Sequence, residues 1–196
     1  MFKKGEKEKN NMTVLEVLKM VSLYLNLYDN FQPLFNGEEL SQEDNLEFQK
    51  ILSGINLTAK SLSGIYKLKV CEEILLSDNS FNLSLLQKPL SKICCLKNQF
   101  GKKQNFNVIN NTLKTNFCGK AIIEYFYLPP TVQTVEDIIE INNCVSLKTF
   151  CMGVISEYCY INNLFDDAFV WEERFNKSLN TKFLSSVFSM PSKRWL

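Results

Sequence analysis

Two stretches near the start of the chain have the spacing of amphipathic helices. From Thr13 onward, apolar residues recur every three or four positions, which predicts a helix with one buried face. Thr13 and Glu16 have the spacing of a capping box, in which each side chain accepts a hydrogen bond from the other residue's backbone N–H. A second stretch begins at Ser41, with Asp44 three positions later, and ends near Gly64. We expect the two helices to pack as antiparallel neighbours.

The hydrophobic period then shortens to two residues, which is typical of strands. Apolar residues alternate with lysines at 66–70, and the strongest alternation lies at 120–128. The Pro129-Pro130 pair ends this last segment, because proline has no N–H to donate to a neighbouring strand. Further short strands are expected at 72–76, 93–96 and 105–109, with a hairpin loop at 98–103. The pattern predicts a small antiparallel sheet or barrel.

Helical spacing returns after Thr134. A short acidic helix is predicted at 135–141, a longer helix at 145–162, and a last helix from about Asn163 to Leu179. An aromatic stripe at helical spacing is more often core than a ligand site. The side chains expected in the core of this helical part, or in contact with another subunit, are Tyr158, Ala168, Trp171 and Phe175.

The order of these elements predicts an α+β, mainly helical fold. We expect a helical bundle from both termini, at 13–64 and 134–182, with a small antiparallel β module inserted at 65–133. Residues 1–12 are expected to form a flexible N-terminal arm, and residues 183–196 an extended C-terminal docking tail.

Composition is ordinary for a globular protein. Hydrophobic residues make up 45% of the 196 residues, and charged residues make up 22%. The formal net charge is +1, so no global field predicts attraction to nucleic acid or to membranes. The first residues lack the apolar core of a signal peptide, and no apolar run reaches the roughly 18 residues that cross a bilayer. We therefore expect an intracellular protein with no membrane partner.

Candidate catalytic and metal-binding chemistry is sparse. The chain contains no histidine, which removes the commonest general base and the commonest metal ligand. Its seven glycines form no phosphate-binding loop. The seven cysteines include the adjacent Cys94 and Cys95 but no C-x-x-C pair, which favours reduced thiols over disulfides or zinc ligands. We expect no catalytic residue, no metal and no cofactor.

The predicted hairpin near residue 100 combines basic and aromatic side chains. Its candidate residues are Lys97, Phe100, Lys102 and Lys103. Basic residues interleaved with an aromatic ring can bind nucleic acid. Three lysines are few for that purpose, so a solvated hairpin tip is the favoured interpretation. In a ring-shaped assembly, the same tip would contact a neighbour, line the channel or face the tail.

The end of the chain has the composition of a docking segment. Proline cannot easily extend a helix, and Trp and Arg are enriched at the energetic centres of protein interfaces. The alternative is that Trp195 folds back onto the protein's own helices. The residues predicted to insert into a partner are Met190, Pro191, Lys193, Arg194, Trp195 and Leu196.

Taken together, several segments resemble the head–tail adaptor proteins of tailed bacteriophages and prophages, which are also called connector, neck or tail accessory proteins. The resemblance rests on the capped helix start at 13–18, the Glu-Tyr-Phe-Tyr-Leu-Pro-Pro segment at 124–130, the helical hairpin at 157–175 and the terminal Arg194-Trp195-Leu196. The order of elements is similar over most of the chain, and the hairpin carries most of the resemblance.

The resemblance implies a non-enzymatic virion protein, assembled in the host cytoplasm, that forms a ring of about a dozen copies. The ring would lie between the portal protein and a downstream tail or neck protein. DNA would pass through its lumen without sequence-specific contacts, and the C-terminal tail would dock on the portal. The alternatives are another tail, neck or baseplate component and a small nucleic-acid-binding regulatory module.

Overall fold

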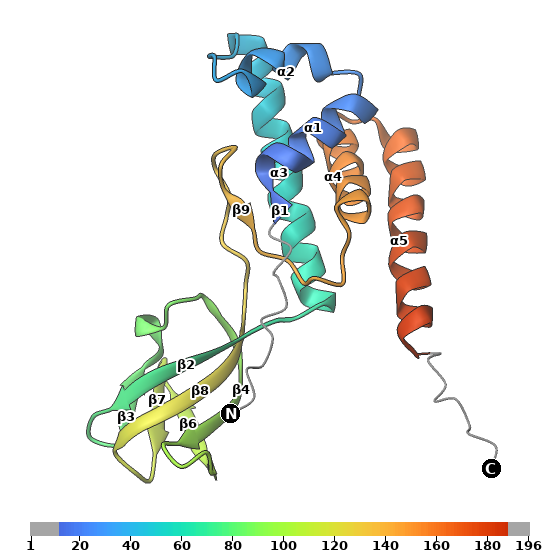
Figure 1. The fold of residues 1–196 in the computed structure, drawn as a ribbon. Coiled ribbons are helices and arrows are strands. Elements are labelled where there is room, and N and C mark those ends of the chain that lie inside the picture. The colour runs from blue at the N-terminus through green and yellow to red at the C-terminus, as the bar shows by residue number, and fades with distance from the viewer. Residues whose placement is uncertain (1–11, 188–196) are drawn as a thin grey trace, which may run out of the picture. The chain divides into compact units, whose positions relative to one another are not determined.

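A computed structural model describes residues 12–187 and divides the chain into two compact units. Residues 12–61 and 131–187 form the first, which we call the helical unit, and residues Leu62–Pro130 form the second, the sheet unit (Figure 1). Each unit has a hydrophobic core of its own.

The helical unit is built mainly from α-helices. The predicted capping box is confirmed, because Thr13 N donates to Glu16 Oε2 at 3.0 Å and Glu16 N donates to Thr13 Oγ1 at 3.2 Å. Among the residues that the structure describes, no helix combines the length and the apolarity that a membrane crossing requires. The helices are α1 (Val14–Tyr24), α2 (Tyr28–Phe35), α3 (Gln42–Ile65), α4 (Leu147–Ile161) and α5 (Phe165–Val187).

The prediction of a short acidic helix after Thr134 is wrong. This segment instead contains β9 (Ile138–Ile139), which pairs antiparallel with β1 (Met12–Thr13). Asp137 shapes the turn before β9, because its Oδ2 accepts hydrogen bonds from the backbone N–H groups of Gln133 at 2.7 Å and Thr134 at 2.9 Å. Such side-chain bonds to the backbone compete with helix formation.

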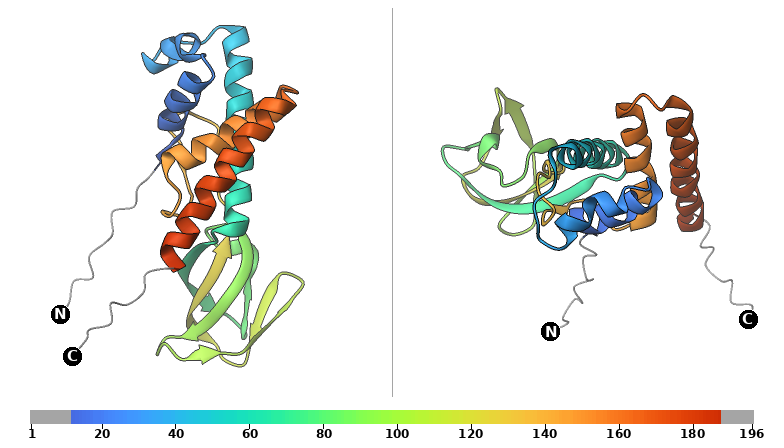
Figure 2. Two further views of the ribbon diagram at one scale, coloured as in Figure 1. Left: turned by 90° about the vertical axis from the view of Figure 1, so that its right-hand side faces the viewer. Right: turned by 90° about the horizontal axis from the view of Figure 1, so that it is seen from above.

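The core of the helical unit lies where α1, α3, α4 and α5 meet (Figures 1 and 2). Gly153 of α4 marks the tightest packing, since a Cβ there would lie 2.7 Å from Thr58 Cγ2 and 3.0 Å from Phe175 Cε2. The fully buried apolar side chains of this core include Val17, Leu18, Val21, Ile51, Ile55, Phe150, Val154, Ile155 and Ala168.

The sheet unit contains two antiparallel sheets. One has the strand order β2-β8-β4-β5 and the other has the order β3-β7-β6. The strands are β2 (Leu68–Leu76), β3 (Ser80–Asn82), β4 (Leu90–Asn98), β5 (Lys103–Gln104), β6 (Phe106–Ile109), β7 (Thr112–Thr115) and β8 (Gly119–Tyr127), and a 3-10 turn, η1 (Leu83–Leu85), follows β3.

Strand β8 lies at the centre of the four-stranded sheet and sets its two sides. Ala121, Ile123 and Tyr125 are buried between the two sheets, in a core that also holds Leu96 of β4 and Leu113 of β7. Successive side chains of a strand point to opposite sides. The intervening residues of β8 therefore point outward, and they are Lys120, Ile122, Glu124 and Phe126.

The predicted fold class, a mainly helical bundle with a small inserted module, is wrong. The described part of the chain is 46% helical and 27% strand, and its strands form three antiparallel sheets, so the fold is mixed α/β. The strands of the sheet unit are more than a small addition to a helical bundle, because they enclose a separate core of eight buried side chains. In addition, the extended segment before α4 pairs with the residues that precede α1.

Candidate functional site

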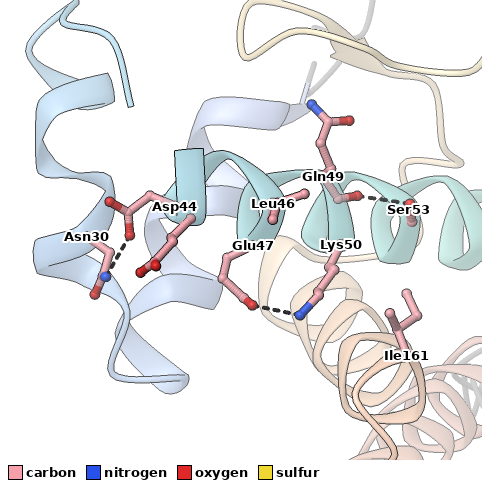
Figure 3. A pocket seen from close by; sticks show the side chains of 9 residues that line it. Asn30, Asp44, Leu46, Glu47, Gln49, Lys50, Ser53 and Ile161 are labelled. Carbon is pink, nitrogen blue, oxygen red and sulfur yellow. Dashed lines mark hydrogen bonds and ion pairs between the residues drawn. The ribbon is translucent and has the colours of Figure 1, made fainter. Parts of the chain in front are cut away.

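An open polar depression lies on the helical unit between the start of α3 and the end of α4 (Figure 3). Its volume is about 610 Å³. Most of its lining residues belong to the first half of α3, and α2 and α4 contribute one side chain each. The lining residues are Asn30, Glu43, Asp44, Leu46, Glu47, Gln49, Lys50, Ser53 and Ile161.

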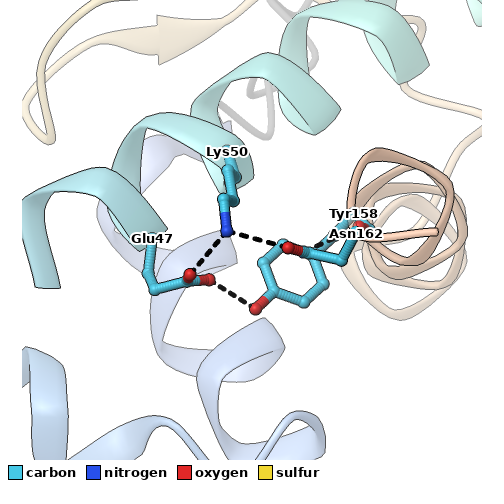
Figure 4. A network of polar contacts seen from close by, with 4 residues as sticks. All are labelled: Glu47, Lys50, Tyr158 and Asn162. Atoms are coloured by element: carbon cyan, nitrogen blue, oxygen red, sulfur yellow. Dashed lines mark hydrogen bonds and ion pairs between the residues drawn. The ribbon is translucent and has the colours of Figure 1, made fainter. Parts of the chain in front are cut away.

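Four side chains beside this depression form a continuous polar network (Figure 4). Glu47 accepts hydrogen bonds from Tyr158 OH at 2.6 Å and from Lys50 Nζ at 2.7 Å. Lys50 Nζ also donates to Asn162 Oδ1 at 2.8 Å. Asn162 Nδ2 in turn donates at 3.0 Å to the backbone carbonyl of Tyr158, which also accepts from the Asn162 backbone N–H at 3.1 Å. The network therefore ties α3 to α4.

The network shifts the pKa values of two of its members in opposite directions. Burial raises the pKa of Glu47, but the bonds from Lys50 and Tyr158 together outweigh it, so the pKa is lowered overall. Burial first, and then the bond to Glu47, raises the pKa of Tyr158. Glu47 is thus held ionised and Tyr158 is held neutral, which suits a structural link between two helices.

A second carboxylate at the depression, that of Asp44, also accepts hydrogen bonds from neighbouring side chains. Its Oδ1 accepts from Asn30 Nδ2 at 2.7 Å and its Oδ2 accepts from Ser41 Oγ at 2.5 Å. The bond from Ser41, and then the bond from Asn30, lower the pKa of Asp44. Within residues 12–187, no group of three His, Cys, Asp or Glu side chains has an arrangement that would hold a metal ion. The depression is therefore an open one in which Asp44, Glu47 and Lys50 already bond neighbouring side chains.

A second feature of the helical unit is an exposed apolar surface around the turn between α4 and α5. Phe165 and Phe169 lie one helical turn apart and are 61% and 66% exposed. The ring of Tyr160 lies 6.4 Å from that of Phe165, measured between centroids. We call this surface the turn face, and it comprises Tyr160, Ile161, Leu164, Phe165, Phe169 and Val170.

On the sheet unit, the outward side of the four-stranded sheet carries a cluster of lysines. Glu124 of β8 forms ion pairs with Lys69 of β2, at 2.6 Å, and with Lys97 of β4. The hydrogen bonds from Lys69 and then Lys97 lower the pKa of Glu124 to about 2. The carboxylate therefore stays ionised and holds lysines from both neighbouring strands.

Further lysines surround this central cluster. Lys120 lies on the outward side of β8, Lys92 is paired with Phe126, and Lys103 is paired with Lys97. We call this surface the basic face, and it comprises Lys69, Leu75, Lys92, Lys97, Lys103, Lys120, Ile122 and Phe126. The acidic side chains on the same side are Glu73 and Glu124, so the basic face keeps a positive excess.

The near-neutral charge of the whole chain conceals an opposition between the two units. Residues 62–130 carry nine lysines and four acidic residues, a formal charge of +5. Residues 12–61 and 131–187 carry seven basic and fifteen acidic residues, a formal charge of −8. The net charge of the whole chain therefore does not reveal that one unit is basic and the other acidic.

The structure separates the four predicted hairpin residues into two pairs. Lys97 and Lys103 are cross-strand partners on the basic face. Phe100 is 82% exposed at the tip, with Lys102 beside it. Asn98 closes the loop, because its Oδ1 accepts from the backbone N–H groups of Phe100 at 3.1 Å and Lys102 at 3.0 Å.

The four residues predicted in the helical core, or at a subunit contact, make contacts within the helical unit. Ala168 is fully buried, Tyr158 is buried in the network with Glu47, and Phe175 packs at Gly153. Trp171 is half-buried, with the Tyr24 ring 5.4 Å away between centroids and the Arg174 guanidinium 4.7 Å from its own ring.

The predicted docking tail lies outside the described residues. Nothing in residues 12–187 therefore bears on the roles predicted for Met190, Pro191, Lys193, Arg194, Trp195 and Leu196.

Sequence patterns did not predict the residue pairs that meet on the basic face and in the network beside the depression. Lys69 and Glu124 both occur in segments correctly predicted as strands, and their outward direction follows from the alternation. Their meeting depends on the register between β2 and β8, which alternation alone does not give. Glu47 and Tyr158 are 111 positions apart, and no local pattern signals their bond.

A comparison of the chain with protein-family models finds no match, and a comparison with curated proteins finds none either.

Proposed function

We propose that this chain is a structural, non-catalytic virion subunit: a head–tail adaptor of a tailed bacteriophage that assembles into a ring between portal and tail. The observation that carries the proposal is the turn face. Soluble monomers rarely expose a contiguous patch of large apolar side chains, so such a patch marks a surface that a partner covers. The polar depression beside it has no enclosed volume for a substrate, and its best-placed groups bond one another.

Exposed apolar side chains on the sheet unit favour a ring over a two-fold dimer. The sheet unit also exposes large apolar side chains, with Leu75 at 62% and Phe100 at 82% exposure. A closed ring needs two different surfaces on each subunit, whereas a two-fold dimer needs one surface that matches itself. Because each unit exposes apolar side chains, the subunit offers the two different surfaces that a ring requires.

Charge also suits a subunit that surrounds DNA without holding it. The helical unit has a formal charge of −8 over its described residues. A lumen lined by such a surface would repel phosphates, whereas each lysine–phosphate contact would add affinity and slow passage. The C-terminal tail, from Met190 to Leu196, supplies the portal contact in this proposal, and its Trp195 is the anchor.

One observation favours a second candidate, a nucleic-acid-binding regulatory module. The basic face presents five lysines and the ring of Phe126 on one side of a sheet, and sheets with aromatic and basic side chains can bind single strands. That activity would depend strongly on salt, because it would rest on phosphate contacts. Another tail, neck or baseplate role is a variant of the structural proposal with a different partner.

Co-purification with the portal protein of the same phage tests the adaptor proposal. Full-length protein should form a stable complex with the portal, and deletion of residues 189–196 should abolish it while the circular dichroism spectrum stays unchanged. In parallel, binding to single-stranded and double-stranded DNA should be weak at 0.15 M salt. Tight, salt-sensitive DNA binding that is lost when Lys97, Lys102 and Lys103 are changed to Gln, together with no portal binding, would favour the regulatory module instead.

A further inference from the structure

The turn face has an acidic rim. Asp166 and Asp167 lie in the first turn of α5, directly beside Phe165, and both are exposed. Glu173 lies one turn beyond Phe169 and forms an exposed ion pair with Lys177 at 2.7 Å. Glu172 accepts a hydrogen bond from Tyr160 OH at 2.7 Å. The apolar centre of the turn face is therefore surrounded mainly by carboxylates.

The basic face has the opposite charge. Its apolar side chains are spread along it, because the half-buried Ile122 and Phe126 of β8 lie on either side of Glu124 and the exposed Leu75 of β2 pairs with Lys120. Lysines accompany them on all four strands of the sheet. Lys103 and Lys120 are exposed, and the ion pairs of Glu124 use other lysines. The two surfaces thus have opposite charges, and both also carry apolar side chains that a partner could cover.

We infer that the basic face of one copy docks on the turn face of the next copy in the assembled protein. This inference rests on the proposed ring and names the two surfaces that close it. Because the surfaces belong to different parts of one chain, the contact is head-to-tail, and each copy keeps one of each surface for its other neighbour. Complementary charge on the rims fixes the orientation of the two copies and disfavours contacts between like faces.

The apolar groups favour a second copy over DNA as the occupant of the basic face. A phosphate backbone would neutralise the lysines, but it would leave the turn face uncovered. A second copy covers both surfaces in the same step. It also explains why a chain of net charge +1 divides into units of +5 and −8 over its described residues.

Paired charge reversals in the full-length protein test this contact. The basic-face variant carries Lys103→Glu and Lys120→Glu, and the turn-face variant carries Asp166→Lys and Glu173→Lys. In the control variant, Lys114→Glu on β7 and Lys148→Glu on α4 change exposed lysines outside the basic face. The concentration at which half of the protein assembles is measured by analytical ultracentrifugation at 0.05, 0.15 and 0.5 M NaCl.

The basic-face and turn-face variants should each need at least about tenfold more protein to assemble than the wild type, because like charges then meet across the contact. An equimolar mixture of the two variants should assemble as readily as the wild type, since opposite charges meet at every contact of an alternating ring. Such rescue also shows that both variants are folded. The control variant should behave as the wild type does, and added salt should weaken wild-type assembly.

Four results would overturn the inference. If the wild type assembles and the basic-face variant assembles equally well, the ring uses other surfaces and the adaptor proposal stands. If both variants fail to assemble alone and in mixture, although their circular dichroism spectra match the wild type, the two surfaces are not partners. If the wild type stays monomeric, with or without portal, the inference and the proposed ring fail together. DNA binding that is lost in the basic-face variant, with assembly unchanged, would assign that surface to nucleic acid.

Discussion

The hydroxyl of Tyr158 donates a hydrogen bond to Glu47 Oε2 across 2.6 Å and so links α4 to α3. Tyr158 is 8% exposed, and its partner carboxylate also accepts from Lys50. A bond to a charged acceptor that is largely shielded from water stabilises more than an exposed one. This link therefore holds the end of α4, and with it the start of the turn face, in a fixed place on the helical unit.

Removing the Tyr158 hydroxyl should destabilise the helical unit measurably. We expect Tyr158→Phe to lower the free energy of unfolding by about 1–2 kcal/mol, because it removes a hydrogen bond to a charged group. Tyr160→Phe is the matched control, since the Tyr160–Glu172 bond is exposed, and it should change stability by less than about 0.5 kcal/mol. Urea unfolding followed by circular dichroism measures both values. Equal effects of the two variants would show that the Tyr158–Glu47 bond stabilises the fold no more than the exposed Tyr160–Glu172 bond does.

Gly153 should not accept a side chain. Replacing a helical glycine by alanine usually gains about 1 kcal/mol, but a Cβ at Gly153 would lie 2.7 Å from Thr58 Cγ2. Overpacking of this kind costs about 1–3 kcal/mol, so Gly153→Ala should be destabilising overall. Gly64→Ala, in the last turn of α3, meets nothing within 4 Å and should be neutral or stabilising. A thermal melt of each variant checks the opposite signs, and a stabilised Gly153→Ala would contradict the tight packing of α4.

Thr58 and Thr149 should respond in opposite directions to the same substitution. The Thr58 hydroxyl is buried and has no hydrogen-bond partner among the described residues. Thr58→Val keeps the shape and removes the unpaired hydroxyl, so we expect a gain of about 1 kcal/mol in unfolding free energy. Thr149 Oγ1 instead lies 2.8 Å from both Ser146 Oγ and Ser178 Oγ. Thr149→Val should therefore cost about 1–3 kcal/mol in the same urea experiment. A destabilised Thr58→Val would imply that its hydroxyl finds a partner.

Glu124 should make the sheet unit sensitive to acid. Hydrogen bonds from Lys69 and Lys97 lower its pKa from 4.5 to about 2. Because the pKa is lower in the folded state, the carboxylate contributes stability that is present above pH 4.5 and is lost as the pH falls toward 2.

Glu124→Gln should remove this part of the pH dependence. Unfolding curves at several pH values from 2 to 6 measure it, and the difference between wild type and variant isolates Glu124, since the other carboxylates are unchanged. The difference should shrink steadily below pH 4.5. Parallel pH profiles would show that the lysines do not hold the ionised carboxylate.

Local patterns predicted most elements, and long-range pairings decided the rest. The capping box at Thr13 and the strand now assigned as β8 follow from spacing and alternation, because both signals lie within a few residues. The segment after Thr134 was expected to be helical, but Met12–Thr13 supplies a strand partner from more than a hundred positions away. The predicted fold class was wrong for the same reason. The inserted strands enclose a core of their own, and no single segment of the sequence reveals it.

The candidate surfaces likewise depend on both local patterns and long-range contacts. Lys69 belongs to β2 and Lys97 belongs to β4, but the role of Glu124 as their common partner depends on the register of three strands. The apolar residues of the turn face look like core in the sequence, because Phe165 and Phe169 have the same helical spacing as buried stripes. Only the packing of α5 through Ala168 and Leu179 shows which side of the helix stays exposed.

The central claim is that the chain assembles head-to-tail into a ring, and the mass of the purified full-length protein in solution tests it most directly. Native mass spectrometry at micromolar concentration and low salt should show one closed species of about a dozen subunits, either alone or once the portal protein is added. The same species should dissociate as salt is raised, because its contacts pair opposite charges. A protein that stays monomeric at every concentration, with and without portal, would contradict the account.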